Sequence, residues 1–475
     1  MANGRFSRRE ILASGAGALG AAALAGRSGA ARGAVAHLPN IVFLLADDLG
    51  VADLSVYGRR DYRTPVLDRL AREGMLFANG YANSAVCSAT RTALITGRYQ
   101  GRLRVGLYEP GGGGADYGLP ADHPTLPSLL RKLGYRTSLF GKWHLGHNAE
   151  HGPNRSGYDY FFGFRGGYDD YFRVGGAQQL GVPIPGAPPP ADLHLYENEK
   201  VADEPGYLTY LLADHASEEI RRNAAARQPF FLSLHFNAPH WPWEGPGDEA
   251  ASKSIVSAFN LDGGSIGKYG EMVTALDSAV GRVLDTIRRA GIERDTLVVF
   301  TSDNGGERFS DTWPYTGAKG ELLEGGLRVP LIIRWPARIK PGSQTSQLMI
   351  SMDFLPTLLA AAGGAPDPAY PSDGENLLPV ILGEAPPHPR RLFWRYKASE
   401  QAAVRDGDYK YLRINGQEYL FNVVADQRER ANLKDKEPAR YAALKAAHAA
   451  WNATLLPYTP DITSANSKGQ WADRY

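Results

Sequence analysis

The 475-residue sequence contains a single cysteine, Cys87, so no disulfide bond can form within the chain. It also lacks an excess of charge of either sign, because 52 Lys and Arg face 51 Asp and Glu and leave a net charge of +1. This balance gives no electrostatic reason to expect nucleic acid or an anionic membrane surface as a partner. No apolar run reaches the roughly 20 residues that span a bilayer, so we expect no stable membrane insertion.

The rest of the composition is that of an ordinary globular protein, with 43% hydrophobic and 22% charged residues. The 54 glycines and 32 prolines indicate many loops, which is where functional sites usually lie. The length allows a large α/β domain together with a smaller one.

The amino terminus has the pattern of a bacterial twin-arginine export signal. Arg8 and Arg9 precede a weakly hydrophobic stretch up to Ala25, and residues 34–36 read Ala-Val-Ala, which is typical of a cleavage site. A disordered basic tail is the alternative. We therefore expect residues 1–36 to be a signal peptide, the Tat translocase to be a partner during maturation, and the mature protein to be periplasmic or secreted. Because this route carries folded proteins, a modified residue or a cofactor could be installed before export.

Apolar runs alternate with helical patterns between residues 40 and 334. The run at residues 40–46, NIVFLLA, is continuous and ends in two acids, which is typical of a buried parallel strand. The alternation predicts an α/β fold with a large mixed, mostly parallel sheet sandwiched by helices, and polar residues recur just after the strand ends, where such sheets bind ligands. Further strands are predicted at residues 137–140, 229–236, 296–301 and 329–334, and helices at 65–73, 92–95, 126–133, 207–222 and 266–290.

Proline-rich stretches at residues 183–190 and 386–389 indicate loops or linkers. The second precedes shorter, alternating runs and one last helical pattern, which predict a small antiparallel sheet with a packed helix. We place a domain boundary there, with a catalytic domain at residues 37–385 and a C-terminal subdomain at 386–475. The strands of the subdomain are predicted at residues 391–396, 409–413 and 418–421, and its helix at about 438–450.

The lone cysteine opens the run CSATRTALITGR. A buried apolar cysteine would be the ordinary interpretation. However, Ser88, Thr90 and Thr92 are polar, Arg91 lies one helical turn away, and no apolar period includes position 87. We therefore interpret Cys87 as part of a site.

Two acidic pairs follow predicted strands. Asp47 and Asp48 end the first apolar run, and Asp303 and Asn304 end another in VVFTSDNGG. One pair alone is often a solvated turn or a helix cap. Three carboxylates and an amide at two parallel strand ends can instead meet at one divalent cation, and all-oxygen ligands favour Ca²⁺ or Mg²⁺ over Zn²⁺.

Basic and imidazole side chains follow other strand candidates. Lys142 and His144 project to the same side of an extended segment in GKWHLG, which places a fixed charge beside a proton-transfer group, although a surface turn would explain this motif alone. Prolines on both sides stiffen the loop that carries His240, whereas His235, inside its strand, is interpreted as a core histidine with satisfied hydrogen bonds. Lys319 opens a glycine-rich turn into the next strand.

Taken together, six fragments in this order resemble the type I sulfatases of the alkaline phosphatase superfamily, and look most like arylsulfatases and N-acetylgalactosamine-6-sulfatases. The resemblance extends from Asn40 to about Asn432. It rests on DDLG, CSATR with TGR, GKWHLG, PHWP, SDNGG and KGELLEGGLRVP.

The resemblance implies that Cys87 is oxidised after translation to formylglycine (3-oxoalanine), whose hydrated aldehyde is the nucleophile. Ala89 stands where the commoner family motif has proline, and this form is associated mainly with radical-type rather than oxygen-dependent formylglycine-generating enzymes. It further implies one Ca²⁺, with Mg²⁺ as the alternative, held by the hydrated residue 87 and by Asp47, Asp48, Asp303 and Asn304.

The resemblance also implies roles for the remaining residues. Arg91 orients the nucleophile, and Asp303 accepts its proton. Lys142, Lys319 and His240 contact the sulfate, and the last two protonate the departing oxygen. His144 removes the proton whose loss releases sulfate. The expected substrate is an aryl or carbohydrate sulfate monoester.

Two other functions stay open at this point. A phosphonate monoester or phosphodiester hydrolase of the same superfamily is one, although those relatives usually carry histidine where this chain has Asn304. A non-catalytic anion-binding protein with unmodified Cys87 is the other. The candidate substrate rim comprises residues 108–117 and 164–171, with Trp241 and Trp243; their side chains could bind a sugar ring or could be loop packing.

Overall fold

A computed structural model describes residues 38–112, 117–172, 194–254 and 264–465. The chain divides into two compact units, Met1–Leu38 and Pro39–Tyr475, and everything below concerns the second. The predicted signal peptide and the proline-rich stretch at 183–190 lie outside the described residues. Within the described ranges, no helix is both long and apolar enough to cross a membrane.

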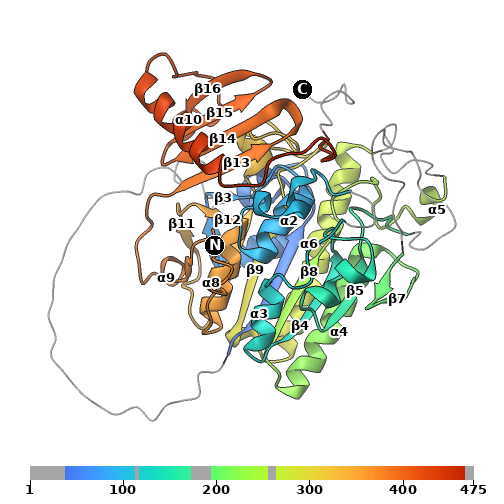
Figure 1. Ribbon diagram of the computed structural model, residues 1–475. Coiled ribbons are helices and arrows are strands. Elements are labelled where there is room, and N and C mark those ends of the chain that lie inside the picture. The colour runs from blue at the N-terminus through green and yellow to red at the C-terminus, as the bar shows by residue number, and fades with distance from the viewer. Residues whose placement is uncertain (1–37, 113–116, 173–193, 255–263, 466–475) are drawn as a thin grey trace, which may run out of the picture. The chain divides into compact units, whose positions relative to one another are not determined.

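The core of the fold is a ten-stranded sheet in the order β11-β2-β10-β9-β1-β8-β4-β5-β6-β7 (Figure 1). Its central strands β9, β1, β8, β4 and β5 are all parallel, whereas β10, β6 and β7 run antiparallel to their neighbours. The strands are β1 (Asn40–Ala46), β2 (Met75–Phe77), β4 (Arg136–Lys142), β5 (Tyr160–Phe164), β6 (Tyr196–Glu197), β7 (Lys200–Val201), β8 (Phe230–His235), β9 (Thr296–Ser302), β10 (Leu331–Arg334) and β11 (Ser343–Thr345). Strands β3 (Gly80–Tyr81) and β12 (Met349–Ile350) form a separate parallel pair.

Strand β1 lies at the centre because its residues 41–46 are all apolar and can be buried on both faces. Val42 pairs with Leu232 of β8 on one side and with Val298 of β9 on the other. Phe43 points to the opposite face, where its ring lies 4.9 Å from that of Phe354. Helices must therefore cover both faces of the sheet.

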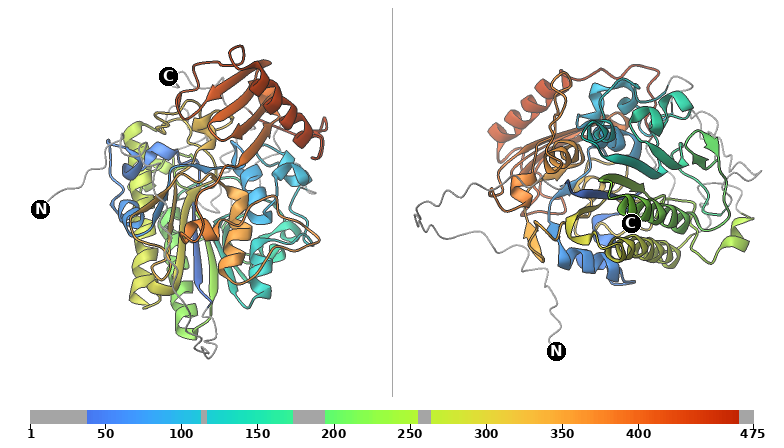
Figure 2. Two further views of the ribbon diagram at one scale, coloured as in Figure 1. Left: turned by 90° about the vertical axis from the view of Figure 1, so that its left-hand side faces the viewer. Right: turned by 90° about the horizontal axis from the view of Figure 1, so that it is seen from below.

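Two groups of helices do so, as Figure 2 shows. Helices α1, α4 and α6 pack on one another over the face that carries Val42 and Leu44. Helices α2, α3 and α8 pack together over the other face. The helices are α1 (Pro65–Glu73), α2 (Cys87–Thr96), α3 (Leu126–Lys132), α4 (Leu208–Ala226), α5 (Glu249–Ser252), α6 (Ile266–Arg289), α7 (Glu324–Leu327), α8 (Phe354–Ala361), α9 (Leu378–Ile381) and α10 (Pro438–Asn452).

A second sheet follows in the chain. It has four antiparallel strands, β13 (Arg391–Tyr396), β14 (Gln401–Asp406), β15 (Tyr409–Ile414) and β16 (Gln417–Asn422), and α10 packs against it. Both sheets belong to the one unit Pro39–Tyr475, so the boundary near residue 385 stays a prediction.

Buried charges join the small sheet to the large one. Lys410 of β15 is fully buried, and its Nζ lies 3.0 Å from Glu324 Oε1 of α7 and 2.9 Å from Glu429 Oε1. Glu324 also accepts hydrogen bonds from Tyr81 and Arg328. Such a fully paired cluster fixes one arrangement of the elements that carry it.

The predicted fold class is confirmed, with differences in detail. The predicted helix at residues 92–95 belongs to a longer helix that begins at Cys87, which is the start we expect from the resemblance. The predicted strand at 329–334 begins at Leu331 and is antiparallel to β9. Strand β14 was not predicted, because QAAVRD has no aromatic residue and only one β-branched residue, Val404.

Candidate active site

The carboxyl ends of β1, β4, β8 and β9 meet at one edge of the sheet because these strands are parallel. Asp47 follows β1, Asp303 follows β9, and Lys142 is the last residue of β4. This edge therefore brings together side chains that are up to 256 residues apart in the chain.

Cys87 is the first residue of α2 and is 1% exposed. Val86 before it is extended, and Thr90 fixes this start by accepting a hydrogen bond from Ser84 N and donating one to Ser84 O. The helix ends at Gly97, whose φ of +67° is left-handed, a conformation that glycine adopts without strain. Burial raises the pKa of the Cys87 thiol, and the nearby lysines only partly oppose this.

The two acidic pairs are in direct contact. Asn304 Nδ2 donates to Asp48 Oδ1 at 2.7 Å, and the backbone N–H of Asp48 donates to Asp303 Oδ1 at 3.3 Å. Asp48 has a φ of +60°, which is uncommon for a residue with a side chain and often marks a functional site. The two acidic pairs therefore lie together, as the sequence predicts.

Each of the three carboxylates has one strong cationic partner. Arg91 Nη2 lies 2.8 Å from Asp303 Oδ2, Lys142 Nζ lies 2.6 Å from Asp47 Oδ2, and Lys319 Nζ lies 2.6 Å from Asp48 Oδ2. These three ion pairs are almost fully buried. The formal charges of the carboxylates and of their partners cancel, so a divalent cation would make the site positive and suited to an anionic substrate.

The local charges shift the acids in opposite directions. Burial and the neighbouring Asp303 raise the pKa of Asp47 despite the attraction of Lys142. Burial alone would also raise the pKa of Asp48, but the charge of Lys319 and its hydrogen bond outweigh it and hold that pKa well below its usual range. Asp48 in turn holds the pKa of Lys319 above its usual value in spite of burial. Lys319 therefore carries its proton in this arrangement.

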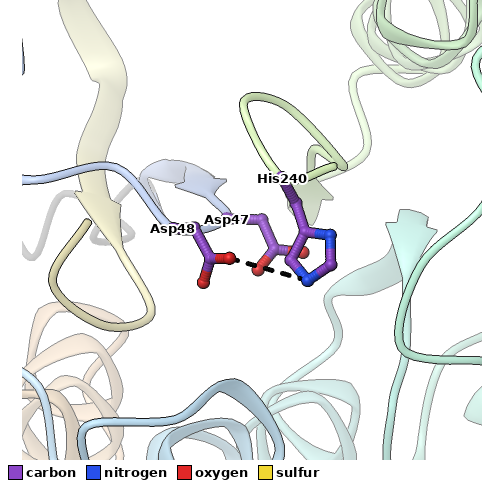
Figure 3. Close-up of side chains that lie close together, drawn as sticks. All are labelled: Asp47, Asp48 and His240. Carbon is purple, nitrogen blue, oxygen red and sulfur yellow. Dashed lines mark ion pairs between the residues drawn. The ribbon is translucent and has the colours of Figure 1, made fainter. Parts of the chain in front are cut away.

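Two histidines complete the cluster. Figure 3 shows His240 facing Asp48, with Nε2 at 3.5 Å from Asp48 Oδ2, and its Nδ1 lies 2.7 Å from the Trp241 carbonyl oxygen. His144 has a φ of +62° and is 4% exposed, and a Cβ at Gly167 would lie only 2.6 Å from its Nε2. Burial, reinforced by the nearby lysines, lowers the pKa of both rings, so both are neutral at pH 7.

The donor set fits a hard divalent cation. Carboxylate and thiol atoms of Asp47, Cys87 and Asp303 all lie within 4.8 Å of one another, and so do atoms of Asp47, Asp48 and His240. Within the described residues, Asp47 Oδ1 and Asn304 Oδ1 are buried without a hydrogen-bond partner. Buried oxygens in this state are costly, and ligation by a cation such as Ca²⁺ would satisfy them.

Of the remaining predicted residues, His235 is buried, and its Nδ1 lies 3.2 Å from the Lys142 carbonyl oxygen and 3.3 Å from Arg91 Nη1. It is thus a core residue that also contacts the site. Trp241 packs at 4.6 Å from the Tyr168 ring and Trp243 at 5.0 Å from the Phe309 ring, and both belong to the hydrophobic core, which agrees with the loop-packing alternative.

Glu307 was missed by the sequence reasoning. It is 7% exposed and lies near Lys319 and Asp48, whose charges lower and raise its pKa respectively. Burial raises its pKa to about 7. The signal was an acid directly after the glycines of SDNGG, which alone does not distinguish a loop residue from a site residue.

Comparison with known proteins agrees with this geometry. The sequence profile of the Sulfatase family matches residues 39–365. This chain is a sulfatase. A second profile, for the C-terminal part of N-sulphoglucosamine sulphohydrolase, matches residues 318–448. The chain therefore belongs to the type I sulfatases of the alkaline phosphatase superfamily and is a sulfuric ester hydrolase.

This sulfatase is similar to enzymes from mammals and to a solved structure. It is 35% identical to N-acetylgalactosamine-6-sulfatase of Canis lupus familiaris over 396 residues, which cover 78% of this chain and 71% of that protein. It is 35% identical to arylsulfatase A of Homo sapiens over 407 residues, which cover 79% and 75%. The crystal structure of Ps i-CgsB in complex with k-i-k-neocarrahexaose aligns with a TM-score of 0.78 at 30% identity, covering 90% of this chain and 93% of that one.

Proposed function

We propose that this sulfatase cleaves carbohydrate or aryl sulfate monoesters with a formylglycine made from Cys87 and one bound Ca²⁺. The observation that carries the proposal is the placement of Cys87 within 4.8 Å of Asp47 and Asp303, inside a cluster that also holds three cationic side chains. A thiol kept for packing alone would not need these neighbours.

The chain's own residues supply the positive charge that a sulfate needs. Lys142 Nζ donates to Asp47 and Lys319 Nζ donates to Asp48, two carboxylates that would also bind the cation. With the cation bound, both ammonium groups would be available to bind the sulfate oxygens. Arg91 stays bound to Asp303 through Nε and Nη2 and neutralises charge beside residue 87. When bound, the Ca²⁺ would add positive charge at Asp47, Asp48, Asp303 and Asn304, which stabilises the anionic transition state.

Proton transfer is assigned to the side chains that surround residue 87. The hydrated aldehyde supplies the attacking hydroxyl, and Asp303 is in position to take its proton. Lys319 gives a proton to the departing alcohol oxygen, because its pKa is held high by Asp48. His240 binds the sulfate with it and shares this role when its Nε2 is protonated. His144, which is neutral, acts as the base that allows sulfate to leave.

The test combines activity with the chemical state of residue 87. Purified protein should hydrolyse 4-nitrophenyl sulfate faster than 4-nitrophenyl phosphate or a 4-nitrophenyl phosphonate, and the peptide that contains residue 87 should show the mass of the aldehyde instead of the thiol. Activity of protein whose Cys87 is still a thiol would refute the assignment of formylglycine as the nucleophile. Preference for the phosphonate would favour the superfamily's phosphonate hydrolases, against which the neutral Asn304 argues.

The alcohol part of the substrate is proposed from relatives. One of them is named for a 6-sulfated N-acetylgalactosamine, and one aligned structure contains a neocarrahexaose. We therefore propose sulfated carbohydrates as natural substrates, to be tested by a screen of sulfated mono- and oligosaccharides. The paired arginines Arg8 and Arg9 support export by the twin-arginine route, and replacing both with lysine should abolish export of the active enzyme.

A further inference from the structure

Glu109 is a buried carboxylate that the proposed chemistry does not use. It is 1% exposed and belongs to the loop at residues 104–112, here called the rim loop. Burying a carboxylate is unfavourable unless hydrogen bonds compensate, so its partners show what the residue does.

Those partners lie in the small sheet and in residues 456–465, here called the C-terminal segment. Tyr458 Oη donates to Glu109 Oε1 at 2.7 Å, and Ser464 Oγ and Lys397 N donate to Oε2 at 2.9 and 2.8 Å. The backbone of Glu109 is also paired, because its N–H donates to Thr463 O and its carbonyl accepts from Ala465 N. Both the side chain and the main chain of Glu109 are thus bound to a segment about 350 residues later.

The other side of the rim loop is bound to the start of α2. Ser88 Oγ donates to Tyr108 O at 3.1 Å and accepts from Gly111 N at 2.7 Å. Ser88 directly follows Cys87. In Figure 1 the chain after α10 runs back from the small sheet toward α2, in agreement with these contacts.

The rim loop also contacts the loop that carries His144. The rings of Tyr108 and Tyr117 lie 5.4 Å apart, edge to face, and Tyr117 Oη donates to the His144 carbonyl oxygen at 3.2 Å. The residues assigned to the sulfate make their contacts elsewhere: Lys142 Nζ binds Asp47, and Lys319 Nζ and His240 Nε2 lie against Asp48. The rim loop therefore borders residue 87 away from the sulfate-binding cations.

We propose that Glu109 is a positioning residue that fixes the rim loop over residue 87, so that the C-terminal segment determines how the alcohol part of the sulfate ester is bound. This inference rests on the proposed function. It assigns the C-terminal segment to substrate binding and not to stability alone.

The test removes the two hydroxyls of the C-terminal segment that bind Glu109, in the double variant Tyr458→Phe/Ser464→Ala. We expect KM to rise at least about tenfold for a sulfated disaccharide, which is the loss that ~1.4 kcal/mol of binding free energy produces. KM should rise less for 4-nitrophenyl sulfate, whose alcohol part is smaller. The inhibition constant of inorganic sulfate should stay unchanged, because the sulfate-binding residues are intact.

The matched control is Tyr409→Phe/Tyr441→Phe, which deletes two hydroxyls that bind Glu437 and Glu418 between the small sheet and α10. It should leave both KM values unchanged. If Tyr458→Phe/Ser464→Ala does not fold, Glu109→Gln, which keeps the side-chain shape, is measured in the same way.

The outcomes separate the two proposals. A lower melting temperature with wild-type KM values for both esters would show that the contact only stabilises the fold, and would overturn the inference. A parallel increase in KM and in the sulfate inhibition constant would also overturn it, because it would place the effect at the sulfate. A wild-type enzyme without sulfate ester hydrolysis would refute the proposed function itself.

Discussion

Replacing Lys410 with methionine tests how the two sheets are held together. Lys410 Nζ binds Glu324 at 3.0 Å and Glu429 at 2.9 Å, and all three groups are buried. Methionine preserves most of the side-chain volume but removes the charge. The two carboxylates would then face each other without the ammonium between them.

Glu429 should lose more of its stabilising contacts than Glu324 does. Glu324 keeps the hydrogen bond of Arg328, and Arg405 lies near it at 3.7 Å. Glu429 keeps the backbone N–H of Glu324. Removing one partner of a buried ion pair typically costs about 3–5 kcal/mol. For a unit of roughly 430 residues the unfolding entropy is about 0.9 kcal/mol/K, so the melting temperature should fall by about 3–6 °C.

The size of this loss should depend on pH. Burial raises the pKa of Glu429 to about 7 while Lys410 is present, and removing the ammonium raises that pKa further. At pH 6 Glu429 of the variant can be protonated at little cost, which avoids a buried charge. At pH 8 protonating Glu429 costs more free energy, and the alternative is an unpaired buried carboxylate. The fall in melting temperature should therefore be larger at pH 8 than at pH 6.

Differential scanning fluorimetry of the purified variant at both pH values measures the effect. Lys445→Met is the matched control, since Lys445 binds Glu418 at 2.8 Å on the surface of the same small sheet. A surface pair of this kind contributes little to stability, so the control should melt like the wild type. If Lys410→Met melts no lower than Lys445→Met, the reasoning about the buried charges is wrong.

The remaining predictions concern catalysis and pH. Cys87→Ala should abolish turnover and leave the circular dichroism spectrum unchanged, and an active Cys87→Ala enzyme would contradict the nucleophile assignment. Lys319→Ala should lower kcat far more for an alkyl or sugar sulfate than for 4-nitrophenyl sulfate, because a good leaving group needs no proton; an equal loss for both would exclude Lys319 as the acid. Removal of divalent cations by EDTA should abolish activity and lower the melting temperature, with both restored by Ca²⁺; an unaffected enzyme would argue against the cation. The folded pKa of Glu109 is raised from its ordinary 4.5 to about 7 by burial, so the folded state binds this proton more tightly and stability falls as pH rises from about 4.5 through 7, by up to about 3 kcal/mol. Glu109→Gln should accordingly lose less melting temperature between pH 5 and pH 8 than the wild type, and identical profiles would contradict that pKa.

The central strands and the acid pairs were predictable because their signals are local. A continuous apolar run such as residues 40–46 can only be buried, and acids that end two such strands must lie at the same edge of a parallel sheet. The start of α2 at Cys87 was predictable as well, and Thr90 and Gly97 mark the two ends of that helix.

The partners of the buried carboxylates were not predictable, because they depend on contacts between distant segments. Nothing in the sequence near Glu109 indicates that Tyr458 and Ser464 bind it, and Glu307 carries no local pattern that separates it from any loop acid. The same holds for Trp243, which was a candidate for the substrate rim. Its neighbours Tyr269 and Phe309 come from later segments that close the core around it.

The central place of β1 also sets an order of events during synthesis. The residues that pair with Val42, Leu232 and Val298, are synthesised about 190 and 256 residues after it. Folds that depend on such distant pairings form slowly. At about 5–20 residues per second, the roughly 220 residues between position 87 and Asn304 take about 10–40 s to translate. Once the sheet closes, Cys87 is only 1% exposed. An enzyme that modified this thiol would therefore have at least this interval, lengthened by slow folding, before the closed sheet buries its target.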